Sequence, residues 1–170
     1  MRMLKAGGST SRGFTFIEIT MVLFIMGLFL TLSVPRLISF VSSGELASSV
    51  SKLSVYIEHV RDLSMYRQEI LILHCKLDNG TFRVTRSDGT VDNKSLLRPV
   101  TLSESVKIID IVLNGEEKII DGEARIVFYP GGKANPSFIH LRGKEDEEIT
   151  LEISYLSRNV KQHKGYIEAN

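Results

Sequence analysis

The chain has 170 residues, 43% of them hydrophobic, and a formal net charge of +1, which suits one modest domain with an additional segment. Residues 1–13 hold three of the 21 basic residues and none of the 20 acidic ones, so the remainder carries a formal charge of −2. This balance disfavours a surface dedicated to nucleic acid. The single cysteine, Cys75, excludes an intramolecular disulfide and gives no sign of the redox compartment. We expect its side chain to be a small buried hydrophobe on a strand.

A basic leader and a long apolar run form the N-terminal part of the chain. The leader, residues 1–13, contains Arg2, Lys5 and Arg12 and no acid. The apolar run, residues 16–34, would form a helix of roughly 29 Å at about 1.5 Å per residue. This length nearly matches a hydrocarbon core of about 30 Å, so the run predicts a membrane-spanning helix.

Glu18 is the one ionisable side chain in residues 14–34. A carboxylate is costly to place in lipid, so an acid in such a segment indicates a functional site until a partner explains it. A secretory signal peptide has an apolar region of about 7–15 residues that ends in small residues, whereas this run is longer and ends Leu-Ser-Val-Pro-Arg. An uncleaved signal anchor accounts for the length and the basic flank but leaves Glu18 unexplained.

The segment Gly13–Glu18 resembles the type III signal of type IV pilins and of the pseudopilins of type II secretion systems. This resemblance implies that a prepilin peptidase cuts after Gly13 and that the new N-terminal residue, Phe14, is N-methylated. Glu18 is then the fifth residue of the mature chain, where the family has glutamate. Pro35 is the twenty-second, where the family often has proline.

Cleavage would place a cationic α-amine on Phe14, at position i relative to Glu18 at i+4 on one helix face. Pairing the two charges offsets much of the cost of burying either one in a low-dielectric medium. The pair can close within one chain. The resemblance implies another use, in which Glu18 meets the amine of the preceding subunit in a filament and sets the axial register.

Pro35 removes a backbone donor and clashes with the preceding turn, so we expect a kink or a short break near residues 31–36. Beyond it, residues 36–68 predict an amphipathic helix that ends near residues 65–68. Its apolar stripe consists of Leu46, Val50, Leu53, Ile57, Val60 and Leu63. The polar residues predicted to lie largely off this stripe are Ser48, Ser49, Lys52, Glu58, Arg61 and Asp62.

Residues 14–35 and 36–68 would together form one long, kinked helix whose first part lies in lipid or in a filament core. Residues 69–157 predict six or so short strands separated by turns rich in Gly, Asn and Asp. Such strands would form antiparallel sheets packed on the helix, which gives an α+β, pilin-like fold. Residues 158–170 predict a polar, loose tail.

The head is similar in its general layout to the H-type minor pseudopilins and to the FimT-like minor pilins. This similarity rests on a strand with a glycine-containing turn, Ile126–Gly132, and on two further strands, Phe138–Leu141 and Ile149–Ser154. A single cysteine excludes the C-terminal disulfide loop of major pilins. No match to the C-terminal calcium site of the major pseudopilin is found.

The sequence predicts no catalytic, cofactor or metal site, and so a protein that is not an enzyme. It has no phosphate-binding loop and no nucleophile-elbow serine. The histidines lack metal-ligand spacing with one another or with Cys75; they are His59, His74, His140 and His163. His74 and Cys75, adjacent on one strand, would face opposite sides of the sheet. The acidic run 145–148 is interpreted as a solvated loop rather than a cation site.

Basic residues gather near the C-terminus, a region with which some FimT-like pilins capture DNA. They are Arg158, Lys161, His163 and Lys164. Glu168 and the chain carboxylate dilute this patch, and Tyr166 is its one nearby aromatic residue. We therefore interpret it as a solvated tail and do not expect nucleic acid as a partner.

The resemblance implies an assembly subunit of a bacterial inner membrane, with its leader in the cytoplasm and its head in the periplasm. The implied partners are the prepilin peptidase, major and minor pseudopilins, and the inner-membrane assembly platform. An H-type subunit would lie at or near the tip of a pseudopilus that supports export of folded proteins across the outer membrane.

The alternative is a minor pilin of a type IV pilus, acting in assembly priming, adhesion or DNA uptake. A membrane-anchored β-domain that binds a ligand and never enters a filament is a different class.

Overall fold

The computed structural model describes residues 15–89 and 97–168, and within them all side chains except those of residues 30–43. Gly13 and Phe14 lie outside the described residues, so cleavage and methylation stay predictions. The chain divides into two units, residues 1–38 and 39–170.

A single helix, α1 (Phe16–Arg67), is found in the described part of the chain. It ends within the predicted range, at Arg67. The next residue, Gln68, has a φ of 55°, in the left-handed region, and its side-chain amide donates to the carbonyl of Met65 at 2.6 Å. The helix includes Pro35 without a break, and the kink predicted there stays a prediction. Where side chains are described, no helical stretch is both long enough and apolar enough to cross a membrane.

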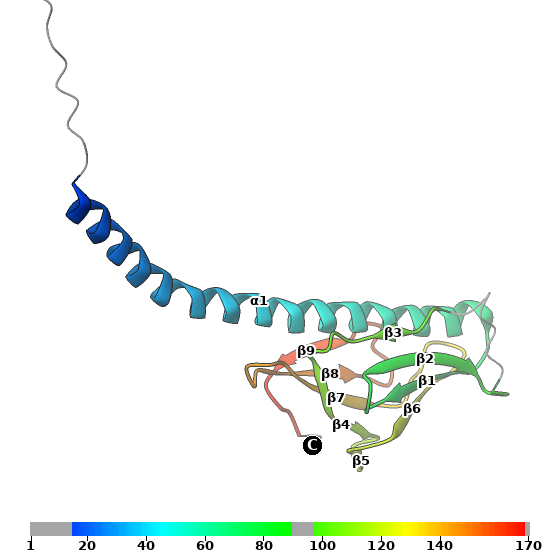
Figure 1. Ribbon diagram of the computed structural model, residues 1–170. Helices are drawn as coiled ribbons and strands as arrows, with labels where there is room; N and C mark the ends of the chain where they lie inside the picture. Colours follow the sequence, from blue (N-terminus) through cyan, green and yellow to red (C-terminus); the bar gives the residue numbers. More distant parts are fainter. Residues whose placement is uncertain (1–14, 90–96, 169–170) are drawn as a thin grey trace, which may run out of the picture. The chain divides into compact units, whose positions relative to one another are not determined.

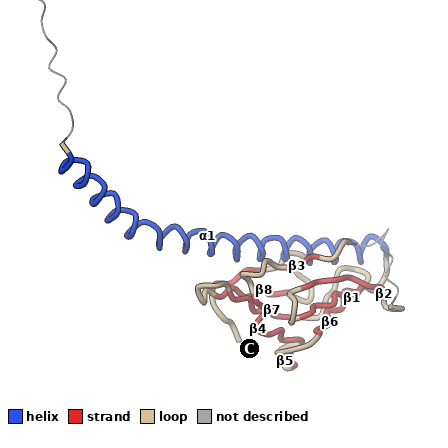
Figure 2. The backbone as a smooth tube through the Cα atoms, viewed as in Figure 1, coloured by secondary structure: helices blue, strands red, loops and turns tan. Residues whose placement is uncertain are grey.

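Two antiparallel sheets form the rest of the second unit (Figure 1). The first has the strand order β3–β2–β1–β6, with β1 (Leu71–Lys76), β2 (Thr81–Arg86), β3 (Val100–Thr101) and β6 (Glu123–Phe128). The second has the order β5–β4–β7–β8–β9, with β4 (Lys107–Leu113), β5 (Glu117–Ile119), β7 (Ser137–Arg142), β8 (Glu148–Ile153) and β9 (Lys161–Lys164). Figure 2 shows the sheets on one side of the second half of α1. The α+β class is confirmed.

The six strands that the sequence predicts correspond to β1, β2, β4, β6, β7 and β8. The three that it misses, β3, β5 and β9, have only two, three and four residues. All three lie at sheet edges, where short and polar strands are common because they blunt unwanted pairing. Such segments are too short to show a period-2 pattern.

The prediction of a loose tail is wrong for residues 158–168. β9 pairs with β8, placing His163 opposite Thr150. Val160, just before β9, is buried, and its N–H donates to Glu58 Oε1 of α1 at 3.1 Å. Strand pairing and burial of one apolar residue therefore hold a segment that its polar composition suggested was free.

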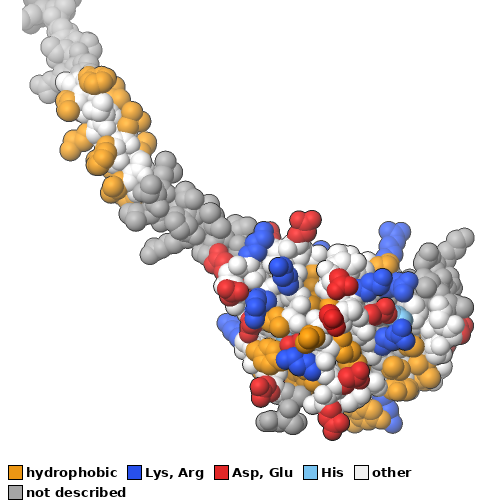
Figure 3. All heavy atoms as spheres, turned by 60° about the horizontal axis from the view of Figure 1, so that its bottom comes forward, with side chains coloured by type: hydrophobic (Ala, Val, Ile, Leu, Met, Phe, Trp, Pro, Cys, Tyr) orange, Lys and Arg blue, Asp and Glu red, His pale blue; other side chains and the backbone are white. Residues whose placement is uncertain are grey.

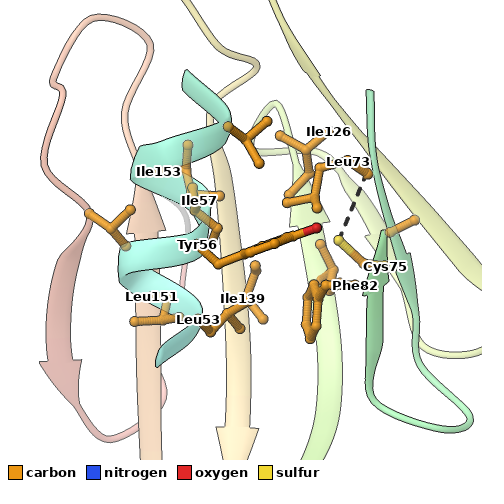
Figure 4. Packing of buried hydrophobic residues seen from close by; sticks show 14 of the residues in the cluster. Leu53, Tyr56, Ile57, Leu73, Cys75, Phe82, Ile126, Ile139, Leu151 and Ile153 are labelled. Carbon is orange, nitrogen blue, oxygen red and sulfur yellow. Dashed lines mark hydrogen bonds between the residues drawn. The ribbon is translucent and has the colours of Figure 1, made fainter. Parts of the chain in front are cut away.

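The core lies between α1 and the two sheets, and Figure 4 shows Leu53 and Ile57 of α1 among side chains from both. The predicted stripe is confirmed: its first five residues are at most 1% exposed, and Leu63 is partly buried against the core. In β1, Leu71, Leu73 and Cys75 alternate with more exposed residues. Cys75 is completely buried, as predicted.

Two residues predicted to lie off the stripe, Ser49 and Arg61, are buried instead. Arg61 is 2% exposed, and its guanidinium carbon lies 5.9 Å from the ring centroid of Phe128. Its Nη2 donates to the carbonyl of Ser154 at 2.8 Å. A long side chain with an apolar stem can pack into a core that its charge would not predict.

Candidate assembly site

Large hydrophobic side chains surround the first part of α1. Within residues 16–29 their exposed fractions range from 44% to 85%. They are Phe16, Ile17, Ile19, Met21, Val22, Leu23, Phe24, Ile25, Met26, Leu28 and Phe29. Because residues 21–26 alone span more than one helical turn, this apolar surface goes round the whole helix, as Figure 3 shows for one face. A helix of this kind is normally covered by lipid or by protein.

Glu18 lies in the first turn of this helix. Its N–H donates to the carbonyl of Thr15 at 3.1 Å and lies 3.3 Å from Thr15 Oγ1. Thr15 therefore caps the helix, and the acid in the first turn is favourable at the positive end of the helix dipole. Sequence reasoning missed this capping role, although the pattern Thr-x-x-Glu is the signature of a capping box.

The carboxylate also borders an apolar groove of about 320 Å³, which is lined by Glu18, Ile19, Val22 and Leu23. One acid beside aliphatic side chains suits contact with a second apolar segment that carries a positive charge. The predicted pairing with the amine of Phe14 is not tested, because Phe14 lies outside the described residues.

The basic residues near the C-terminus are largely engaged with acids of the head. Arg158 donates to Asp62 Oδ2 of α1 at 2.6 Å. Lys161 and His163 donate to the two carboxylate oxygens of Glu152, at 3.1 Å and 2.7 Å. Burial pushes the pKa of Glu152 up, but hydrogen bonds from His163, Lys161 and Ser154 outweigh it and lower the pKa. This pairing reduces the positive charge that the segment could offer to a phosphate backbone.

The acidic run 145–148 contacts its own β7–β8 hairpin. Glu147 Oε2 accepts from the N–H of Glu145 at 2.9 Å, and Glu148 pairs with Arg142 at 2.7 Å. No group of three or more potential metal-binding side chains is present in the described parts of the chain.

His74 and Cys75 lie on opposite faces of β1, as predicted. His74 contacts Glu123 through Nδ1, and its Nε2 lies 2.8 Å from Thr85 Oγ1. The hydrogen bond from His74 lowers the pKa of Glu123. On the other face, burial raises the pKa of Cys75, so its thiol stays protonated and unreactive.

A buried hydrogen-bonded pair that the sequence did not reveal joins Asp110 of β4 to His140 of β7, each 1% exposed. His140 Nδ1 donates to Asp110 Oδ1 at 2.6 Å, and Nε2 donates to the carbonyl of Ile167 at 2.9 Å. Neither ring nitrogen is left to exchange a proton with a substrate. The two residues are 30 positions apart, so no local spacing could have found them.

A comparison with solved structures identifies the fold. The minor pseudopilin EpsH from the type 2 secretion system of Vibrio cholerae is similar, with a TM-score of 0.53 and 13% sequence identity. The match covers 71% of this chain and 97% of that chain. No protein-family model and no curated protein matches the sequence. The chain therefore has the α+β fold of a minor pseudopilin.

Proposed function

We propose that this chain is a non-enzymatic minor pseudopilin of a type II secretion system. It is cleaved after Gly13, methylated at Phe14, held in the inner membrane and assembled at or near the pseudopilus tip. The observation that carries the proposal is the first part of α1, apolar and exposed on all sides, in a chain with the fold of a minor pseudopilin.

An apolar helix of this kind needs two successive environments in such a subunit. Lipid covers residues 16–29 before assembly, and the helices of neighbouring pseudopilins cover them afterwards. Transfer between the two requires the assembly platform in the inner membrane. The groove beside Glu18 then accepts part of a neighbouring helix, and the carboxylate pairs with that subunit's terminal amine.

The registry role of Glu18 is tested by Glu18→Val. We expect normal cleavage by the prepilin peptidase but little of this variant in sheared filament fractions, because the terminal amine loses its buried partner. Thr15→Ala is the matched control, since it removes the helix cap and keeps the acid. We expect it to be recovered nearly as well as the unaltered chain. Normal recovery of Glu18→Val would count against the role.

Pseudopilins and type IV pilins share the signal segment, so this segment does not distinguish a role in secretion from a role in a type IV pilus. Deletion of the gene distinguishes the two. We expect loss of exoprotein secretion, with twitching and DNA uptake unchanged. The opposite pattern would assign the chain to a type IV pilus. A secretin, an assembly ATPase and other pseudopilins encoded nearby would agree with the first outcome.

DNA capture is tested with residues 36–170 at physiological salt. We expect no micromolar binding, because Arg158 and Lys161 are paired with carboxylates. Micromolar binding that disappears when Arg158, Lys161 and Lys164 are neutralised would favour the uptake alternative.

A further inference from the structure

Residues 165–168, here called the C-terminal strap, follow β9 and lie against the second sheet (Figure 1). The strap begins at Gly165, whose φ of 84° suits a residue without Cβ. Thr150 Oγ1 donates to the carbonyl of Gly165 at 2.7 Å and accepts the N–H of Ile167 at 3.3 Å. Because Ile139 and Leu151 face the core, the alternate positions His140 and Thr150 face the strap.

His140 holds the centre of the strap. Its ring stacks on Tyr166 with the centroids 3.9 Å apart and the planes at 16°. The only hydrogen bond found to the carbonyl of Ile167 in the described residues comes from His140 Nε2. The Tyr166 hydroxyl lies 3.3 Å from Asp110 Oδ2, and Lys118 Nζ donates to that hydroxyl at 2.9 Å.

This geometry places an acceptor beside each ring nitrogen of His140. Nδ1 faces the carboxylate of Asp110, and Nε2 faces the carbonyl of Ile167. Both partners are acceptors, because the Asp110 carboxylate also pairs with Lys118 Nζ at 3.2 Å and a carbonyl has no proton to give. Hydrogen bonds to two acceptors need a proton on each ring nitrogen, so only the imidazolium form satisfies both in the closed arrangement.

Loss of one proton would affect the two hydrogen bonds unequally. A bond to a carboxylate is charge-assisted and stronger than one to a neutral carbonyl, so the remaining proton stays on Nδ1. Nε2 then presents a lone pair to the Ile167 carbonyl oxygen at a site with almost no access to water. Two facing acceptors repel each other, and an unsatisfied buried carbonyl is costly.

Few other titratable groups act on His140. Asp110 on β4, Lys118 on β5 and Tyr166 on the strap face it or its partner directly. On β8 and β9, Glu152 pairs with both Lys161 and His163. Glu148, next to Thr150 on that face of β8, pairs with Arg142 at 2.7 Å.

We propose that His140 is a proton-operated latch for the C-terminal strap. With both ring nitrogens protonated, the strap is closed on the sheet. Loss of the Nε2 proton opens it and uncovers the face of β7 and β8 around Phe138, His140 and Thr150. The latch is independent of the assembly role and would operate in a chain that enters no filament.

Hydrogen exchange of the strap and ¹⁵N NMR of the histidine rings, measured on the full chain in detergent from about pH 5 to about pH 9, test this proposal. After correction for intrinsic rates, we expect strap exchange to rise about tenfold or more over the pH interval in which the His140 ring loses a proton. The amide of Leu151 should stay protected, which distinguishes local opening from unfolding.

Two variants sharpen the test. His163→Gln changes the other nearby histidine, on β9, and should leave the transition in place. His140→Phe, which keeps a ring beside Tyr166 and removes both donors, should leave the strap open at every pH, and if it does not fold, the NMR result on the unaltered chain decides. The proposal is overturned if the ring loses a proton while the strap stays closed, or if it keeps both protons throughout. Opening of the strap and of Leu151 together would also overturn it.

Discussion

The two halves of α1 use apolar side chains in opposite ways. In residues 16–29 they surround the helix and are exposed. In residues 44–67 most of them form one stripe, which is buried against two sheets, although Val55, Met65 and Tyr66 are exposed. One continuous helix thus contains a part whose apolar stripe is buried in the head and a part whose apolar side chains are exposed.

This difference separates folding from assembly. The stripe in residues 44–67 belongs to the core of the head, so changes there should alter the stability of the head. The first part of α1 lies in the other compact unit, so changes there should alter assembly and leave the stability of the head unchanged. Matched substitutions in the two halves test whether this separation holds.

The largest effect is expected for Leu53→Ala compared with Leu23→Ala. Leu53 is completely buried, and its truncation should lower the free energy of unfolding of the head by about 2–5 kcal/mol. Leu23 is 63% exposed, and its truncation should change that quantity by less than about 0.5 kcal/mol. Urea denaturation followed by tyrosine fluorescence reports on the head, because all five tyrosines lie beyond residue 55. Equal losses of stability in the two variants would contradict the separation between the two halves of α1.

A smaller effect, of opposite sign, is expected for Arg61→Met. Among the residues that the structure describes, none is a hydrogen-bond partner of Arg61 Nε or Nη1. Burial lowers the pKa of the guanidinium, against the opposing influence of Glu58 and Asp62. Methionine keeps the apolar stem and removes the charge, so we expect the free energy of unfolding of the head to rise by about 1 kcal/mol.

The control for this change is Lys52→Met, at an exposed position of the same helix half. We expect it to alter the denaturation midpoint very little. If Arg61→Met destabilised the head strongly, the hydrogen bond to Ser154 would matter more than the cost of burying the charge.

The smallest effect is expected for Glu152→Gln, on β8 next to the edge strand β9 of the second sheet. The pKa of Glu152 is lowered in the folded chain, so its contribution to stability is complete above the ordinary value of 4.5 and is lost as the pH falls through the lowered value. At neutral pH the free energy of unfolding of the variant should be lower than that of the unaltered chain by less than about 1 kcal/mol. In acid this difference between the two chains should vanish. Thermal unfolding across this pH range measures it, with Glu117→Gln on β5 as the control. A difference that persists in strong acid would rule out the ion pairs as its source.

The sequence was most informative where one periodic pattern extends over many residues. The stripe from Leu46 to Val60 and the alternation around Cys75 both predicted burial correctly, because apolar periodicity follows directly from helix and strand geometry. The capping role of Thr15 was within reach too, since the Thr-x-x-Glu pattern is local.

Features that depend on distant residues could not be found in this way. Asp110 and His140 meet because β4 and β7 pair, and the strap reaches them only after β9 adds to the sheet. Arg61 is buried because an apolar stem and the Phe128 ring accept it, which no charge pattern indicates. The edge strands are fixed by their neighbours rather than by their own composition.

Intact-mass and N-terminal analysis of the chain from cells that contain a prepilin peptidase tests the central claim most directly. The claim is that the first part of α1 packs in a filament after a prepilin peptidase has removed residues 1–13. It predicts a mature chain that begins with N-methylated Phe14. A chain that keeps residues 1–13, or that begins at any other residue, would contradict it.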